Sequence, residues 1–296
     1  MLINTSNHST DDCDSFKKSN LIYHNFDQGS AEWIQHRFNF ITASSISTIL
    51  GNNNNKSYKN LIAEKASNGK YKPNITSNST KWGHRYEPVA NMIYSYKNNL
   101  VIHECGFVNN PQYPLLGASP DGIINSDLLI EIKCPISRKI DGNIKPEYYH
   151  QIQQQLFVCD AKYCDFVECQ FEEVDYNNFW KHFDDNNKYK GIIIHCIVDH
   201  TKKNYYSPII LANNKIDLKE WFDITINSNV DHITYWINNV YNCQRVFKEE
   251  QWYNKIKPKI DTFWRTVSNY KQNGLDELCN SLNVSKKKII FDKCMI

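Results

Sequence analysis

The stretch GASPDGIINSDLLIEIKCP, at Gly117–Pro135, contains two short apolar runs on either side of a polar turn. Gly122–Ile124 and Leu128–Lys133 are predicted to be strands, because both are rich in isoleucine and leucine and are flanked by turn residues. The segment Asn125–Asp127 between them has the length of a β-hairpin connection. The sequence therefore predicts a hairpin at this position.

Helical and strand patterns alternate around the hairpin. Helices are predicted at Ser30–Phe38, from about Thr42 or Ser44 to Gly51, at Trp82–Lys97 with Pro88 near its first turn, and at Pro146–Val158. Further strands are predicted at Val101–Val108, Tyr163–Gln170 and Gly191–Val198. From about Ile216 the pattern is again helical, marked by Trp221, Trp236, Trp252 and Trp264. This order predicts an α/β fold with a mixed central β-sheet flanked by helices and a helical C-terminal extension.

Two carboxylates and a lysine are expected to meet at the hairpin. Side chains alternate along a strand, so Glu131 and Lys133 face one way and Ile130 and Ile132 the other. With a three-residue turn, Asp121 lies opposite Glu131. Facing carboxylates repel each other, and a hard divalent cation with oxygen ligands would compensate. We expect Asp121, Glu131 and the backbone carbonyl of Ile132 to hold Mg²⁺, with Mn²⁺ as a substitute.

This set of groups suits phosphodiester hydrolysis. A bound metal polarises the phosphate and lowers the pKa of an attacking water, and the ammonium of Lys133 can orient that water or stabilise the developing negative charge. The alternative is a hairpin whose charged residues merely face solvent, since Asp and Glu-x-Lys at this spacing also occur by chance.

Four blocks of the sequence resemble one family. GASPDGI and LLIEIKCP resemble the PD-(D/E)-x-K nuclease signature, in the version found in phage lambda exonuclease and the YqaJ-type viral recombinases. WGHRYEPVA resembles the family's upstream helix and places the glutamate that points into the family's metal site at Glu87, so the resemblance implies that Glu87 is also a catalytic residue and metal ligand. PEYYHQIQQQLFV resembles the helix after the active-site strand and places the functional glutamine at Gln153. AEWIQHRFNFITAS resembles the N-terminal segment and places Arg37 and Ser44 where the family binds a 5′ phosphate.

The resemblance implies a restriction-endonuclease-like core and a magnesium-dependent DNA exonuclease. The enzyme would act 5′ to 3′ on double-stranded DNA ends and generate single strands for recombination or repair. A single-strand annealing protein and further copies of the chain are the partners that the family implies. Two alternatives remain: a structure- or sequence-specific endonuclease with the same metal site, and a DNA-binding protein whose nuclease site has decayed.

Several of these residues also have simpler interpretations. Glu87 could be a solvated carboxylate on a helix surface. Gln151 competes with Gln153 for the functional role, because Gln151 and Gln155 share a helix face that Gln153 does not.

At the predicted phosphate site, Arg37 could instead pair with Glu32 or Asp27, although its guanidinium suits a fork-like grip on phosphate. Ser44 would add a hydroxyl at the start of a helix, and Gln153 is also placed beside this site. Trp33 could belong to the core or stack on a terminal base.

Composition narrows the class of protein. The chain has 296 residues, a formal net charge of +2 and a hydrophobic content of 41%, so it can build a core, and its charge does not identify a partner. No apolar run is long enough to span a membrane, and the start lacks a secretory pattern. We therefore expect an intracellular protein, in the cytoplasm or nucleus of the host cell if it is viral.

The cysteines, histidines and glycines lead us to expect no iron–sulfur cluster, no zinc site and no ATP site. The ten cysteines include no C-x-x-C pair and are expected to be reduced thiols. The spacing of Cys159, Cys164 and Cys169 does not suit an iron–sulfur cluster, the histidines lack zinc-binding spacing, and no glycine-rich loop for ATP is present. In sum, we expect a disordered or loosely packed tail at 1–29, a PD-(D/E)-x-K nuclease core at 30–215 and a helical extension packed on it at 216–296.

Overall fold

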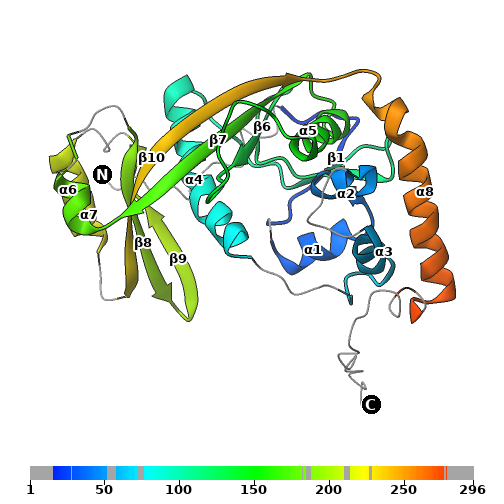
Figure 1. Ribbon diagram of the computed structural model, residues 1–296, viewed down its shortest axis with the longest axis horizontal. Coiled ribbons are helices and arrows are strands. Elements are labelled where there is room, and N and C mark those ends of the chain that lie inside the picture. The colour runs from blue at the N-terminus through cyan, green and yellow to red at the C-terminus, as the bar shows by residue number, and fades with distance from the viewer. Residues whose placement is uncertain are drawn as a thin grey trace, which may run out of the picture.

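Helices and strands alternate along the chain in a mixed α/β fold (Figure 1). The computed structural model describes residues 16–27, 29–51, 58–71, 77–181, 183–184, 188–209, 214–226, 229–276 and 278. The α-helices are α1 (Ala31–Arg37), α2 (Ile46–Leu50), α3 (Tyr58–Ala66), α4 (Asn78–Asn98), α5 (Pro146–Val158), α6 (Tyr176–Lys181), α7 (Lys215–Thr225) and α8 (Trp252–Asn273), with a 3-10 turn at Ala43–Ser45. The strands are β1 (Ile22–His24), β2 (Ile41–Thr42), β3 (Phe107–Asn109), β4 (Leu116–Ala118), β5 (Gly122–Asn125), β6 (Leu128–Lys133), β7 (Tyr163–Val174), β8 (Lys190–Val198), β9 (Thr201–Tyr206) and β10 (Val230–Phe247).

The strands form two sheets. The larger has the order β5-β6-β7-β10-β8-β9, and the smaller has the order β1-β3-β4-β2. In the larger sheet β6 and β7 are parallel, joined through α5, whereas the other neighbours are antiparallel. The predicted mixed sheet flanked by helices is confirmed.

The hairpin of β5 and β6 has the predicted register. Gly122 pairs with Ile130 and Ile123 with Leu129, before the pairing shifts near the turn. This register directs the preceding residue, Asp121, toward Glu131. On the other face of β6, Ile130 is fully buried among apolar residues of α4 and β7. The alternation along β6 thus separates a core face from a polar face.

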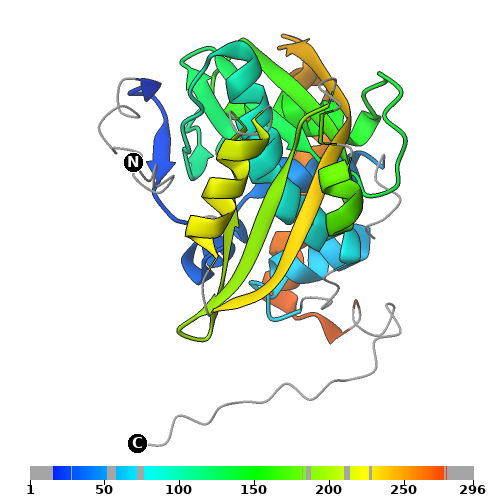
Figure 2. The same ribbon diagram turned by 90° about the vertical axis from the view of Figure 1, so that its left-hand side faces the viewer.

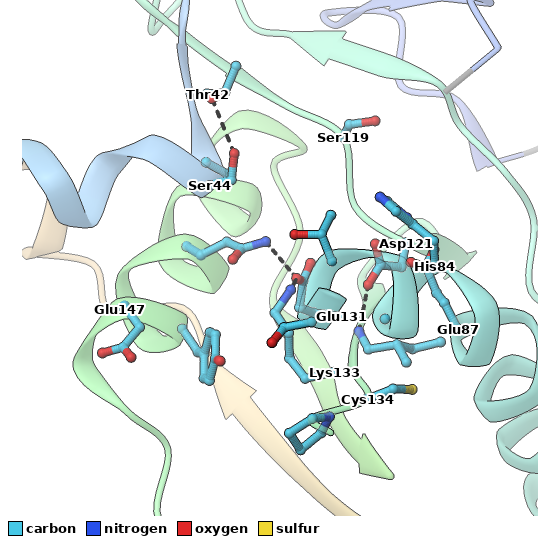
Figure 3. A pocket seen from close by; sticks show the side chains of 18 of the residues that line it. Thr42, Ser44, His84, Glu87, Ser119, Asp121, Glu131, Lys133, Cys134 and Glu147 are labelled. Atoms are coloured by element: carbon cyan, nitrogen blue, oxygen red, sulfur yellow. Dashed lines mark hydrogen bonds and ion pairs between the residues drawn. The ribbon is translucent and has the colours of Figure 1, made fainter. Parts of the chain in front are cut away.

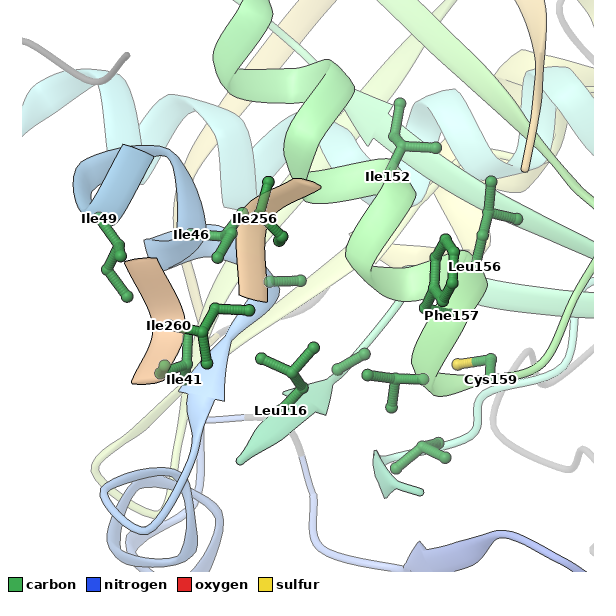
Figure 4. Close-up of a cluster of buried hydrophobic side chains, with 14 of the residues drawn as sticks. Ile41, Ile46, Ile49, Leu116, Ile152, Leu156, Phe157, Cys159, Ile256 and Ile260 are labelled. Carbon is green, nitrogen blue, oxygen red and sulfur yellow. The ribbon is translucent and has the colours of Figure 1, made fainter. Parts of the chain in front are cut away.

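Helix α5 contributes to a hydrophobic cluster that is separate from the one around Ile130, and Figure 4 shows this cluster from close by. Ile152 and Leu156 are fully buried in this cluster, together with residues of α2, α8 and β4. The Gln154 side chain, also fully buried, donates hydrogen bonds to the carbonyls of Ile41 at 2.7 Å and Gly117 at 3.0 Å. Because Ile41 lies in β2 and Gly117 in β4, α5 holds together the two strands that lead to the predicted site residues.

Helix α4 begins earlier than predicted. The Ser77 side chain caps it by accepting a hydrogen bond from the backbone N–H of Thr80, so the helix starts at Asn78 rather than Trp82. Pro88 therefore lies in the middle of the helix, not in its first turn. Serine favours the position before the first helical residue, and Ser77 has this role in the structure.

The predicted C-terminal extension contains the helices α7 and α8, but it is not helical throughout. Val230–Phe247 is a long strand, β10, between β7 and β8, although α7 and α8 on either side of it are helical. Trp236 accordingly lies in a strand, where it is buried at 1% exposure. Residues 279–296 of the predicted extension lie outside the described residues.

Two long strands, β7 and β10, run between two parts of the molecule (Figure 1). At one end lie α6, α7, β8 and β9, and α7 covers β8 in the view of Figure 2. We call this part the distal lobe. At the other end lie α1, α2, α3, α5 and α8.

The predicted N-terminal tail is partly ordered. Ile22–His24 forms β1, which pairs with β3 in the smaller sheet, whereas residues 1–15 lie outside the described residues. Among the described residues, none of the helices combines the length and the apolar character that crossing a membrane requires.

Two glycine substitutions test this packing with opposite signs. A Cβ at Gly117 in β4 would lie 2.1 Å from the ring of Phe107, so Gly117→Ala should lower the free energy of unfolding by about 1–3 kcal/mol. A Cβ at Gly83 in α4 would meet nothing within 4 Å, so Gly83→Ala should raise it by about 0.5–1 kcal/mol. Urea denaturation measures both, and an unchanged stability of Gly117→Ala would contradict the packing of Phe107 on β4.

Candidate active site

A pocket of about 780 Å³ lies where the end of β6 faces α1, α4 and the start of α5. Figure 3 shows Asp121, Glu131 and Lys133 within it, with Glu87 and His84 on one side and Ser44 and Thr42 on another. The predicted site residues that line this pocket are Trp33, Arg37, Ser44, Glu87, Asp121, Glu131, Ile132 and Lys133. Segments more than 90 positions apart in the sequence thus converge on one cavity.

Glu131 is the most deeply held of these charges, with its side chain 1% exposed. Its Oε1 atom accepts hydrogen bonds from the ammonium of Lys133 and from the Gln151 amide, the latter at 2.5 Å. Its Oε2 atom accepts one from the Gln155 amide at 2.6 Å. Donors on both oxygens offset the cost of burying the carboxylate.

Asp121 lies beside this carboxylate. Its Oδ2 atom accepts a hydrogen bond of 2.6 Å from the backbone N–H of Ile132. Burial, followed by the charges of Glu131 and Glu87, raises the pKa of Asp121 well above its ordinary value. The surrounding protein therefore disfavours the ionised form of the Asp121 carboxyl group.

Glu87 and Lys133 complete the charged group. Burial raises the pKa of Glu87, and the charge of Glu131 adds to this against the opposing effect of Lys133. For Lys133, burial lowers the pKa, but Glu131 and Asp121 together outweigh it, so that the pKa is raised and the side chain is an ammonium. Three carboxyl groups thus lie close together around the single ammonium of Lys133 at this end of the pocket.

The predicted phosphate-binding residues form a second group in the same pocket. The Arg37 guanidinium stacks on the Trp33 ring at 3.8 Å from its centroid and donates to the Ser44 hydroxyl at 3.2 Å. Burial lowers the pKa of Arg37 to about 10, against the opposing charge of Glu64, so it is positively charged at neutral pH. Trp33 is 9% exposed, and its indole N–H donates to the Ser119 hydroxyl at 3.4 Å.

The predicted glutamine, Gln153, lies elsewhere. Its amide N–H donates to the Phe247 carbonyl at 2.8 Å, and its carbonyl accepts from the backbone N–H of Glu249 at 2.9 Å, so that it fastens the junction of β10 and α8 to α5. Gln151, on the opposite side of the helix, lines the pocket and contacts Glu131. The placement of Gln153 as a catalytic and phosphate-binding residue is therefore corrected, and Gln151, the alternative, is the glutamine that lies in the pocket.

Other pocket residues were not predicted from the sequence. Arg138 forms an ion pair of 2.5 Å with Glu168, which is 1% exposed, and the Arg138 guanidinium lies 5.5 Å from the centroid of the Tyr148 ring. The Lys133 ammonium lies 5.6 Å from the same centroid. The only sequence feature that could have indicated Arg138 is its position as a basic residue soon after β6, and this feature by itself is weak. Further polar residues that line the pocket and were not predicted include Ser79, Thr80, His84, Lys145 and Glu147.

The cysteines Cys159, Cys164 and Cys169 are buried free thiols. Burial raises the pKa of each of them. They therefore pack as small apolar side chains in the interior.

A comparison with models of known protein families finds a match for this chain. Residues 32–162 match the model of the YqaJ-like viral recombinase domain, a range that contains all of the predicted site residues. The resemblance to this family that the sequence predicted is confirmed.

Two relatives with similar sequences are viral proteins. The chain is 27% identical to an uncharacterized protein of Acanthamoeba polyphaga mimivirus, over 86% of the chain and 55% of that protein. It is also 27% identical to a protein of African swine fever virus, over 44% of the chain and 45% of that protein. The chain spans about half the length of these curated relatives.

Among solved structures, the alkaline exonuclease LHK-Exo of Laribacter hongkongensis is similar with a TM-score of 0.52 and 20% identity, over 86% of this chain and 100% of that one. The same protein has been solved in complex with dAMP. This similarity shows that the two chains share a fold.

The crowding of carboxylates predicts a stabilising substitution. Asp121→Asn should raise the Tm of the protein in EDTA, because it removes one of two facing charges and keeps an oxygen that can accept from Ile132. The gain should be about 1 kcal/mol and can be measured by thermal unfolding. As a control, Asp127→Asn removes a carboxylate that pairs with Lys162 at 2.7 Å and should give no gain. A lower Tm for Asp121→Asn would mean that the charge on Asp121 is favourable without a metal.

Proposed function

We propose that this protein is a magnesium-dependent DNA exonuclease that degrades one strand from the 5′ end of double-stranded DNA. The observation that supports this most is the convergence of Asp121, Glu131 and Lys133 with the Arg37–Ser44 pair in one pocket. A carboxylate–lysine group is suited to cleaving a phosphodiester bond, and an arginine–serine pair is suited to holding a terminal phosphate. The exonuclease function of the fold relative LHK-Exo adds support by analogy.

The donor atoms of the pocket fit Mg²⁺. Asp121, Glu131 and the Ile132 carbonyl offer hard oxygen ligands, and burial together with the charges of Glu131 and Glu87 raises the pKa of Asp121, which a divalent cation would counteract. Across the described part of the chain, no three His, Cys, Asp or Glu side chains come together as a metal site. Mg²⁺ is commonly held by one or two carboxylates completed by waters and substrate phosphates. Glu87 would add charge beside these ligands, and Mn²⁺ could replace Mg²⁺.

Each side chain then has a separate task in hydrolysis. When bound, Mg²⁺ would supply Lewis-acid polarisation of the phosphate and lower the pKa of the attacking water. Lys133 would orient that water and stabilise the negative charge that develops on the phosphate. Gln151 and Lys133 would hold Glu131 in place from the pocket side, since both donate to its Oε1 atom.

The Arg37 end of the pocket would select the substrate. Its guanidinium lies over the Trp33 ring and donates a hydrogen bond to the Ser44 hydroxyl, so both groups are close enough together for one 5′ phosphate to accept hydrogen bonds from them. Trp33 would support Arg37 from below rather than stack on a base, because its face is already covered. The remaining single strand would be available for recombination or repair. The proposed partners are a single-strand annealing protein and further copies of this chain, and the proposed location is inside a host cell.

One assay tests the chemistry and the substrate class together. Linear duplex with a 5′ phosphate should be degraded in Mg²⁺, with Ca²⁺ or EDTA giving none, and closed circular DNA should stay intact. Lys133→Ala should lower the rate by about a hundredfold or more, because it removes a group that acts in the transition state. Gel electrophoresis of end-labelled DNA measures this. Equal cleavage of circles would point to an endonuclease with the same metal site, and no cleavage by the folded wild type would point to a DNA-binding protein whose site has decayed.

A second experiment tests end recognition. Arg37→Ala should reduce the preference for phosphorylated over unphosphorylated 5′ ends by about tenfold or more, because it removes a charge-assisted hydrogen bond to phosphate. The comparison uses kcat/KM on the two ends, with Arg265→Ala in α8, outside the pocket, as the matched control. A preference that survives in Arg37→Ala would exclude this residue from phosphate recognition.

A further inference from the structure

The two oxygens of the Glu131 carboxylate have different surroundings. Oε1 contacts Lys133 and Gln151, which both line the pocket. Oε2 contacts Gln155, which is completely buried and does not line the pocket. The carboxylate therefore turns one oxygen toward the cavity, while the other is fixed toward the interior.

The Asp121 carboxylate is held in a similar way. Its Oδ2 atom is occupied by the backbone N–H of Ile132 at 2.6 Å. Asp121 thus has one oxygen bound to a backbone donor, whereas both oxygens of Glu131 accept hydrogen bonds, Oε1 from residues that line the pocket and Oε2 from buried Gln155. A cation in the pocket would therefore meet Glu131 through Oε1 and Asp121 through its other oxygen.

Binding through single oxygens distinguishes between the common divalent cations. Mg²⁺ requires a compact octahedron of six ligands and retains several waters, whereas Ca²⁺ takes up to about eight oxygens and readily accepts both oxygens of one carboxylate. A site whose carboxylates can each offer only one oxygen meets the needs of Mg²⁺ and withholds the additional ligands that favour Ca²⁺.

We propose that Gln155 determines the metal specificity of this site by holding Glu131 Oε2 in the interior, so that Glu131 offers one oxygen and Mg²⁺ is favoured over Ca²⁺. This inference rests on the proposed metal-dependent function. Gln155 is a positioning residue, since it acts through Glu131 and does not reach the pocket.

The burial of Gln155 is itself costly, which argues for a specific role. Within the described residues its Oε1 atom has no hydrogen-bond partner although it is buried, and a buried polar atom without a partner destabilises the folded state. An apolar side chain of the same length would fill the space in the core of α5 without that cost. The amide N–H to Glu131 is the one interaction of this side chain that the structure records.

The test compares the same substitution at two positions of α5. Gln155→Met keeps the length of the side chain and removes the donor to Glu131. Gln153→Met makes the same chemical change at the junction of β10 and α8, away from the pocket. Isothermal titration calorimetry of the full chain with MgCl₂ and with CaCl₂ gives the Kd of each cation, and urea denaturation confirms that each variant is folded.

In Gln155→Met the affinity for Mg²⁺ should fall by about tenfold or more, as is typical when a group behind a metal ligand is lost. The affinity for Ca²⁺ should change by less than about threefold, because the freed Oε2 can become an additional ligand. The ratio of the two Kd values should therefore move toward Ca²⁺, and Gln153→Met should keep the wild-type ratio.

Gln155→Asn provides a second variant that retains an amide but is too short to reach Oε2, and it should shift the ratio in the same direction. An unchanged ratio in a folded Gln155 variant would overturn the specificity role and leave the metal-dependent nuclease intact. A wild-type protein that binds neither cation would overturn the proposed function as well. The two failures are thus distinguishable.

Discussion

The burial of the Glu131 carboxylate is the constraint on which the rest of the structure depends. Removing a charged carboxylate from water costs several kcal/mol unless donors replace the lost solvent. The structure supplies them from two directions, with Lys133 on the same strand and Gln151 and Gln155 on α5. The distance between β6 and α5 is therefore fixed by a polar interaction, while the apolar cluster around Ile152 fills the space behind it.

Helix α5 distributes its glutamines in all directions around its axis. Gln151 and Gln155 reach β6, Gln154 holds β2 and β4, and Gln153 holds the segment between β10 and α8. Amide side chains are suited to this task because they carry donors and acceptors without a charge that must be neutralised. One helix thus fixes the strand with the lysine, the segment with the predicted phosphate site and the start of the C-terminal helix.

The parts of the fold that depend on local geometry could be predicted from the sequence. The register that brings Asp121 to Glu131 was predicted correctly, although β5 extends to Asn125 and a register shift between Ile123 and Asn125 takes the place of the predicted three-residue turn. Ser30 caps α1 through its side chain, as is usual for a serine at a helix start. The choice between Gln151 and Gln153 could not be made, because a helix with glutamines on several faces gives no polar side that marks the pocket. Strand β10 was misread because apolar and aromatic side chains occupy both of its faces, which hides the two-residue period of a strand. The pocket residues near Arg138 were missed because their contacts join segments about 30 positions apart.

The unbroken course of β7 has a mechanical consequence. Glu168, in register beside Lys133, and Val174, in contact with the apolar cluster of the distal lobe, belong to the same strand, about 20 Å apart at the rise of a β-strand. Between them β7 pairs with β10, with one register shift between Asn238 and Val240, so a continuous two-stranded ribbon joins the two parts of the molecule. A molecule that binds the distal lobe and exerts a force on it would transmit that force along β7 and β10 to the strand beside Lys133. Distance from the pocket therefore does not make the distal lobe mechanically independent of it.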